Sequence, residues 1–163
     1  MFMPGIILRR LASITNLADT SNLYRISIWT GTLGLIRSHW LKGTGLGLVA
    51  FSEKYQYFIY GSAIAVHSHN LILQITAEMG IFGIIAFLIF AGALVKWALN
   101  SGVNMKSRDM RYVIFALVGA VGAHILHGFV DFVWYDPRIL FMFWAVAAML
   151  ICGIIRGQEA YCG

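Results

Sequence analysis

The sequence predicts an all-α integral membrane fold, with about three transmembrane helices and an outer-face segment that carries short interfacial helices. Of its 163 residues, 60% are hydrophobic and only 12% are charged, whereas soluble domains carry about 25% charged residues. Three apolar stretches also approach the length of about 20 residues that a bilayer requires. Backbone inside lipid must satisfy its own hydrogen bonds, so these stretches are expected to be helices.

The membrane-spanning helices are expected at residues 71–97, 112–130 and 139–155. The first of them contains a single charged residue, Glu78, before Lys96. Glycines lie within the spans at Gly80, Gly83, Gly92, Gly119 and Gly122. Small residues let neighbouring helices approach closely, so the spans are expected to form a bundle.

The orientation of the spans follows from their short connections. The connection between the first two spans is basic, with Lys106, Arg108 and Arg111 against one acidic residue. The positive-inside rule assigns that connection to the cytoplasm. The loop at 131–138 and the segment before residue 71 are then outside. Within the loop, Asp136-Pro137 predicts a helix N-cap followed by proline at the first helical position.

The chain is expected to divide into an extracytoplasmic loop segment at 1–69 and a three-helix transmembrane region at 70–163. Residues 26–36 are apolar but too short to span a bilayer. We therefore predict an interfacial or re-entrant helix there, in contact with membrane lipid.

Charge and cysteine content exclude two classes of function. The net charge is +5, but the basic residues are scattered among apolar spans, so no nucleic-acid partner is expected. Two cysteines, Cys152 and Cys162, are too few for a disulfide framework or a cysteine zinc site.

The strongest local cluster of polar residues is His67-Ser68-His69-Asn70, directly before the first span. A neutral imidazole can take a proton from an attacking hydroxyl near neutral pH. The same residues also suit an ordinary helix start, with Ser68 or Asn70 as the cap. Spacing alone leaves both interpretations open.

Several motifs agree with a known pattern. His69-Asn70 is followed after nine residues by Gly80 and then by Gly83, as in His-(Asn/Ser/Gln)-x9-Gly-x-x-(Gly/Thr/Tyr). Upstream stand Arg25-x-x-x-Trp29 and, at 39–47, His-Trp-Leu-Lys-Gly-Thr-Gly-Leu-Gly. In this order they resemble the Arg-x-x-x-(Leu/Trp) and His-Pro-Leu-x-Gly-x-Gly-x-Gly elements of the O-antigen ligase and polymerase family. Members of that family have many more spans, so the chain resembles a C-terminal part truncated at its N-terminus.

The resemblance implies glycosyl transfer at the outer face of the bacterial cytoplasmic membrane, without a metal or other cofactor. The donor would be a glycan on undecaprenyl diphosphate, and the acceptor a glycan or a lipid-linked sugar. His69 and Arg25 are the expected catalytic residues. Substrate binding is expected from Arg37, Asn70, His67, His127 and Asp131. Asn70 could also fix the His69 ring by a hydrogen bond.

The arginines are candidates for binding the donor's diphosphate. A guanidinium can bind two phosphate oxygens and stabilise the charge that develops on the leaving group. The resemblance favours Arg25, but Arg37-x-x-x-Leu41 fits the short arginine pattern as well. Either residue could instead extend toward lipid headgroups.

The glycines are expected to shape the backbone. Gly43, Gly45 and Gly47 lack the spacing of a dinucleotide-binding loop. They predict a flexible outer loop that lets backbone approach substrate, or else an ordinary turn. Gly80 and Gly83 complete the family motif.

Two further polar features lie in or near the spans. His124, His127 and Asp131 share one helical face at i, i+3 and i+7. With His67 and His69 they could ligate zinc, although no metal site is expected; otherwise His127 and Asp131 would orient groups in the outer cavity or pair with each other. Glu78 is expected to form a salt bridge or hydrogen bond to a neighbouring helix.

Two other functions use the same features. A non-enzymatic membrane module, such as part of a transporter or an assembly partner, would explain the spans and Glu78. A zinc-dependent membrane hydrolase would explain the histidines. The ordered Arg25, Gly43, His69 and Gly83 pattern favours glycan transfer, but it does not separate a ligase from a polymerase.

Overall fold

The computed structural model describes residues 20–131 and 134–159, and all regular secondary structure in these ranges is helical. The elements are α2 (Thr20–His39), α3 (Leu48–Tyr55), the short 3-10 helix η1 (Gln56–Phe58), α4 (Leu71–Asn104), α5 (Arg108–His127) and α6 (Pro137–Glu159). The all-α prediction is confirmed.

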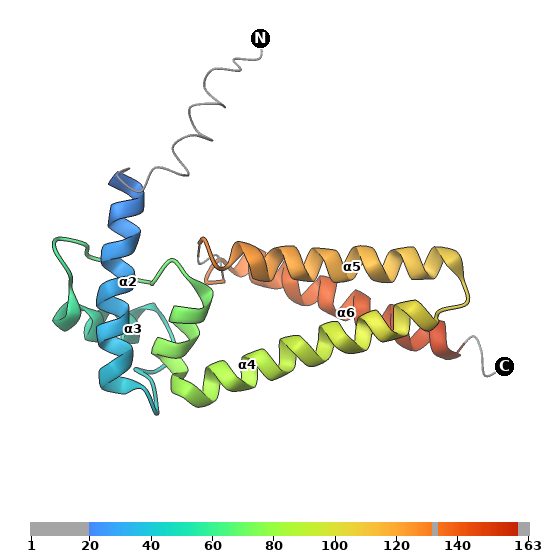
Figure 1. The fold of residues 1–163 in the computed structure, drawn as a ribbon, viewed down its shortest axis with the longest axis horizontal. Helices are drawn as coiled ribbons and strands as arrows, with labels where there is room; N and C mark the ends of the chain where they lie inside the picture. Colours follow the sequence, from blue (N-terminus) through green and yellow to red (C-terminus); the bar gives the residue numbers. More distant parts are fainter. Residues whose placement is uncertain (1–19, 132–133, 160–163) are drawn as a thin grey trace, which may run out of the picture.

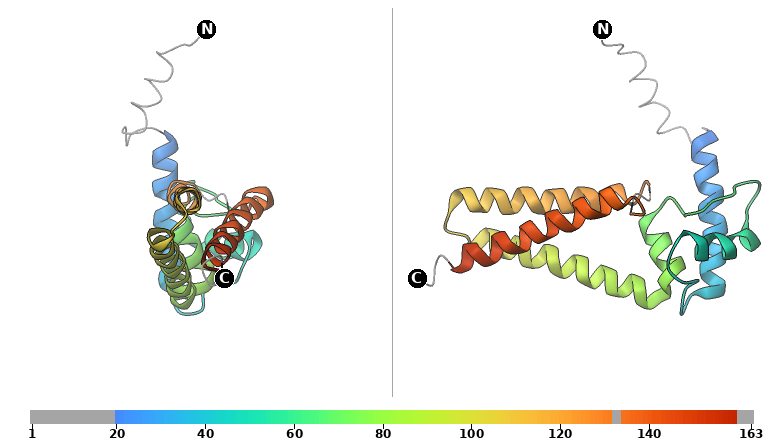
Figure 2. Two further views of the ribbon diagram at one scale, coloured as in Figure 1. Left: turned by 90° about the vertical axis from the view of Figure 1, so that its right-hand side faces the viewer. Right: turned by 180° about the vertical axis from the view of Figure 1, so that it is seen from behind.

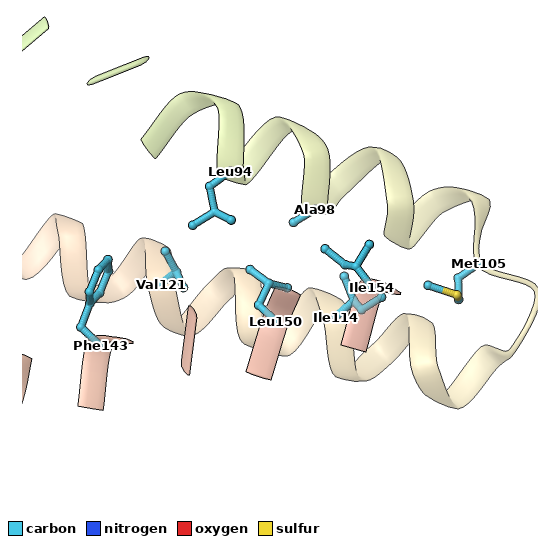
Figure 3. Packing of buried hydrophobic residues seen from close by; sticks show 8 residues of the cluster. All are labelled: Leu94, Ala98, Met105, Ile114, Val121, Phe143, Leu150 and Ile154. Carbon is cyan, nitrogen blue, oxygen red and sulfur yellow. The ribbon is translucent and has the colours of Figure 1, made fainter. Parts of the chain in front are cut away.

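Three helices, α4, α5 and α6, are long and apolar enough to cross a membrane, as predicted. They pack against one another as a bundle (Figure 1). Figure 3 shows its core, where side chains from all three helices meet. The core residues are Leu94, Ala98, Met105, Ile114, Val121, Phe143, Leu150 and Ile154.

The outside of the bundle is also apolar. Phe82 is 67% exposed on α4, and Phe141 is 74% exposed on α6. Large aromatic and aliphatic side chains continue along both helices, with Ile89 and Met142 among them. Hydrocarbon is the solvent that suits such a surface.

Side-chain caps begin each of the three helices. The Asn70 Oδ1 accepts from the backbone N–H of Leu73 at 3.0 Å, and Ser107 accepts from Met110 at 3.4 Å. The Asp136 Oδ1 accepts from the N–H of Arg138 at 2.9 Å. The predicted N-cap before Pro137 is therefore confirmed.

The predicted first span is not one straight helix. Gly80, with φ 66° and ψ −164°, interrupts α4. The loop after α2 supplies partners for the backbone at this break. Thr44 N–H donates to the carbonyl of Ala77 at 2.8 Å, and Gly45 N–H donates to that of Glu78 at 3.1 Å. In return, Ile81 N–H donates to the Trp40 carbonyl at 2.8 Å.

The break divides the molecule into two regions. Residues 81–104 remain in the bundle, and at about 1.5 Å rise per residue they can cross a bilayer. Residues 71–79 turn aside and join α2, α3 and η1 at one end of the bundle, a region that we call the head (residues 20–80). Glu78 therefore belongs to the head, not to the interior of the first span as predicted.

Helix α2 runs across the axis of the bundle, as the views in Figures 1 and 2 agree. Its buried residues Ile28, Gly31, Thr32 and Leu35 follow helical spacing. They face a second core with Phe51, Tyr55, Ala63, Ala65 and Ala77. A helix is thus present at the expected position, 26–36, and is longer than predicted; it is not among the helices suited to crossing a membrane.

Replacing Gly80 with alanine should destabilise the fold. A Cβ at this position would lie 2.4 Å from the Leu41 carbonyl oxygen, and φ and ψ fall in a region that only glycine adopts readily. We expect G80A to lower the free energy of unfolding by about 2 kcal/mol or more. Thermal unfolding in detergent micelles, followed by circular dichroism, measures this.

G92A is the matched control, because a Cβ at Gly92 would meet no atom within 4 Å. It should leave the unfolding midpoint unchanged or raise it slightly, since alanine favours helix. A G80A protein as stable as wild type would contradict this account of the break.

Candidate functional site

The histidine turn, residues 67–70, lies where the head meets the bundle. One backbone hydrogen bond and one side-chain hydrogen bond join the start of α4 to the end of α5. Leu71 N–H donates to the Gly128 carbonyl at 2.7 Å, and the Asn70 Nδ2 donates to the Phe129 carbonyl at 2.9 Å. The turn is thereby held against the residues that follow α5.

This junction brings two distant residues together. The Nδ1 of His69 lies 3.0 Å from the Oδ1 of Asp131, 62 residues away in sequence. Both side chains are partly open to solvent, at 29% and 42% exposure. Because an ionised carboxylate can only accept, the neutral form of His69 carries its proton on Nδ1 in this contact and leaves Nε2 as an acceptor.

The backbone of His69 is unusual as well. Its φ of 52° is the only positive φ of a non-glycine residue in the described chain. Such a conformation is uncommon for a histidine and is often found at functional sites.

His67 lies against His69, with ring centroids 4.1 Å apart. Its Nδ1 accepts from the backbone N–H of His69 at 3.3 Å. Burial and the neighbouring His69 lower the pKa of His67, and Asp131 partly offsets them. A neutral His67 suits this contact, because a protonated ring could not accept the bond.

Asn70 has partners other than the one expected from sequence. Its Oδ1 caps α4 and its Nδ2 reaches Phe129, while the His69 ring is held by Asp131. The idea that Asn70 fixes the imidazole is therefore corrected: the carboxylate occupies that position.

The predicted grouping of His127 with Asp131 is also different in the structure. Helix α5 ends at His127, so the helical spacing does not continue to Asp131. The His127 ring is exposed, and residues 20–131 and 134–159 offer it no hydrogen bond or ion pair. Asp131 instead pairs with His69.

Both candidate arginines lie on α2. Arg25 is half-buried and Arg37 is exposed. Arg25 follows Tyr24, whose hydroxyl donates to the carbonyl of Ile64, three residues before His67. Within the part of the chain that the structure describes, neither guanidinium has a hydrogen bond or ion pair. Arg25 thus lies on the stretch of α2 that is tied to the segment leading into the histidine turn.

The glycines of the predicted loop have a structural role. Gly43 and Gly45 have φ of 71° and 102°, and a Cβ at Gly43 would lie 2.1 Å from the Glu78 carbonyl oxygen. Their loop, which the sequence predicts to be flexible, is hydrogen-bonded to α4 at Ala77 and Glu78. A Cβ at Gly83 would collide with Met79 across the break.

A network of hydrogen-bonded polar side chains lies beneath the histidine turn, and the sequence predicted only part of it. The Gln74 Nε2 donates to the Glu78 Oε1 at 2.8 Å, and the Tyr135 hydroxyl donates to the same oxygen. Glu78 was predicted to bond to a neighbouring helix; it does form hydrogen bonds, but its partners are Gln74 in its own helix and Tyr135 in the turn before α6. In the sequence, only the i, i+4 spacing of Gln74 and Glu78 could have indicated this network.

The zinc alternative finds no support in the geometry. Within the described residues, no group of three or more histidine, cysteine or acidic side chains is close enough to hold a metal ion. His124 instead packs between Trp134 and Phe143, with ring centroids 5.1 and 5.0 Å away.

The lowered pKa of His67 gives a prediction for stability. Because the folded state binds this proton more weakly than the unfolded state, the contribution is present above about pH 6.5 and is lost as the pH falls through the lowered pKa. H67N cannot titrate, and its Oδ1 can replace Nδ1 as acceptor. The fall in unfolding temperature between about pH 7.5 and pH 5 should be smaller for H67N than for wild type.

H127N is the control for this measurement, because His127 is exposed and has no hydrogen bond or ion pair among the described residues. Its fall in unfolding temperature should differ from that of wild type less than the fall of H67N does. Equal acid sensitivity of H67N and wild type would contradict the assignment.

Comparison with known proteins agrees with the motifs. The family model described as O-antigen ligase matches residues 1–88. The match includes the histidine turn, the loop glycines and the break in α4. Comparisons with curated proteins and with solved structures give no match. Since the family model covers more than half of the sequence, the chain belongs to the O-antigen ligase family.

Proposed function

We propose that this protein transfers or polymerises a glycan from an undecaprenyl-diphosphate-linked donor onto an acceptor sugar hydroxyl, at the outer face of the bacterial cytoplasmic membrane. The family membership supports an activity of the ligase or polymerase type. The observation that carries the proposal is the contact between His69 Nδ1 and Asp131 Oδ1 at 3.0 Å.

The contact suits general base catalysis. Asp131 accepts the Nδ1 proton and leaves the Nε2 of His69 free to take the proton of the acceptor hydroxyl. The hydroxyl oxygen then attacks the anomeric carbon, and the bond between that carbon and the diphosphate oxygen breaks. The diphosphate leaves with the bonding electrons, and direct displacement inverts the anomeric centre. Asp131 stabilises the imidazolium that forms.

The leaving diphosphate needs positive charge. Arg25 is the better candidate, because it is half-buried and adjacent to the Tyr24 contact with Ile64. A guanidinium without a protein partner can offer its full set of donors to phosphate oxygens. Arg37 lies near the other end of α2, twelve residues along.

The charge distribution supports the proposed side of the membrane. The connection between α4 and α5 contains Lys106, and Arg108 and Arg111 follow it in the first turn of α5. It lies at the end of the bundle opposite the head (Figure 1). By the positive-inside rule that end faces the cytoplasm. The histidine turn would then face outward.

Replacing His69 or Asp131 should abolish most glycan transfer. Loss of the base predicts that H69A falls by about two to four orders of magnitude. D131N should fall by about a hundred-fold or more, because the amide can hold the ring in the wrong tautomer. The assay uses the full chain in phospholipid vesicles, with undecaprenyl diphosphate carrying a radiolabelled oligosaccharide and an unlabelled acceptor.

D109N is the matched control, since Asp109 lies in the first turn of α5 at the other end of the bundle. Its transfer rate should match wild type at equal amounts of inserted protein. Wild-type transfer by H69A would remove the imidazole from the mechanism. A wild-type chain that transfers no label would favour the non-enzymatic alternative.

The two arginines can be separated in the same assay. R25A should lower transfer by about a hundred-fold, because it removes charge stabilisation from the leaving group. R25K should recover only part of that loss, since lysine cannot bind two phosphate oxygens in a fork. R37A should change transfer less than R25A. The opposite order would assign the diphosphate to Arg37.

A further inference from the structure

A chain of hydrogen bonds runs from the histidine turn into the head. The backbone N–H of Ser68, between the two histidines, donates to the Gln74 Oε1 at 2.6 Å. The Gln74 Nε2 donates to the Glu78 Oε1 at 2.8 Å. Ser68 and Gln74 are fully buried, and Glu78 is 8% exposed. Buried polar groups with satisfied bonds of this kind fix a single geometry.

The other end of the chain is Tyr135, whose hydroxyl donates to the same Glu78 oxygen. Burial and the Glu78 carboxylate raise the pKa of the Tyr135 phenol, so this group keeps the proton that it donates. The Gly47 backbone and the Gln74 side chain act in the opposite direction and lower this pKa, but burial and Glu78 outweigh them. Tyr135 comes four residues after Asp131 in the sequence.

We propose that Gln74, Glu78 and Tyr135 are positioning residues. They keep the His69 imidazole and the Asp131 carboxylate in the contact that catalysis requires. The inference rests on the proposed function and deepens it. Gln74 binds the backbone of Ser68, next to His69, and Tyr135, four residues after Asp131 in the sequence, binds Glu78. Glu78 accepts from both, so it joins the two halves of the catalytic pair.

The strained backbone of His69 explains why this hydrogen-bond network is needed. A residue held at φ 52° returns to a more favourable conformation unless its surroundings prevent it. The Ser68 bond to Gln74 holds the residue directly before it. Loss of the network would let the turn relax and would move the imidazole from the carboxylate, and small displacements of a catalytic group lower rates strongly.

Kinetics of Tyr135 and Glu78 variants test the proposal in the vesicle assay. Y135F should lower kcat by about ten- to a hundred-fold, with little change in the KM for the lipid-linked donor. E78A should lower kcat to a similar extent. The double variant Y135F/E78A should have the same kcat as E78A alone, because the two residues share one bond. E78Q keeps an acceptor oxygen and should recover most of the rate. Y112F, at an exposed tyrosine in the first turns of α5, should match wild type.

A second measurement does not depend on activity. Nitrogen NMR of the full chain labelled at histidine, in lipid nanodiscs, reports the tautomer of each neutral ring, and the spectrum of H69A assigns His69. Wild type should show one tautomer, protonated on Nδ1. Y135F should show a mixture, as should D131N, whereas Y112F should keep the single tautomer.

The outcomes separate this inference from the proposed function. If H69A and D131N lose transfer but Y135F keeps both its kcat and a single tautomer, the positioning role is wrong and the proposed function stands. If the wild-type chain transfers no label, the proposed function fails. The effect of Y135F on the His69 tautomer then still decides whether the network holds the pair.

Discussion

The arrangement of this protein depends on the backbone break at Gly80. A helix that turns near a membrane leaves peptide groups without partners, and in an apolar environment each such group is costly. Here the loop after α2 satisfies them, with bonds between Trp40 and Ile81 and from Thr44 and Gly45 to α4. The bond from Ile81 to Trp40 also joins the loop after α2 to the bundle, so the contacts that stabilise the turn of α4 also link the head to the bundle.

The candidate site follows from how the two regions meet. Asn70 caps α4 and binds the Phe129 carbonyl, so the start of one helix and the end of another are fixed as a unit. His69 and Asp131 project from the two sides of this junction. Neither residue lies inside a membrane-spanning helix, which keeps a carboxylate and an imidazole near water, where their charges can be tolerated.

The sequence predicted the features that depend on composition and local chemistry. Apolar length indicated α4, α5 and α6, and Asp136 indicated the start of α6. It could not predict the break at Gly80, because glycines within an apolar stretch are equally typical of close helix packing. Nor could it pair Asp131 with His69. Helical spacing grouped the carboxylate with His127, and only the end of α5 at that residue separates them. Contacts across 62 residues, like that between Glu78 and Tyr135, depend on the tertiary fold.

The transverse course of α2 has a consequence for kinetics under the proposed function. Its outward face carries Leu23, Ile26 and Leu33, which are 50%, 41% and 47% exposed, so it suits the boundary between headgroups and acyl chains. A polyprenyl carrier would arrive there by lateral diffusion within one leaflet. The donor and the protein would then meet by diffusion in two dimensions. The mole fraction of the donor in the membrane, not its bulk concentration, would set how often the protein binds a donor.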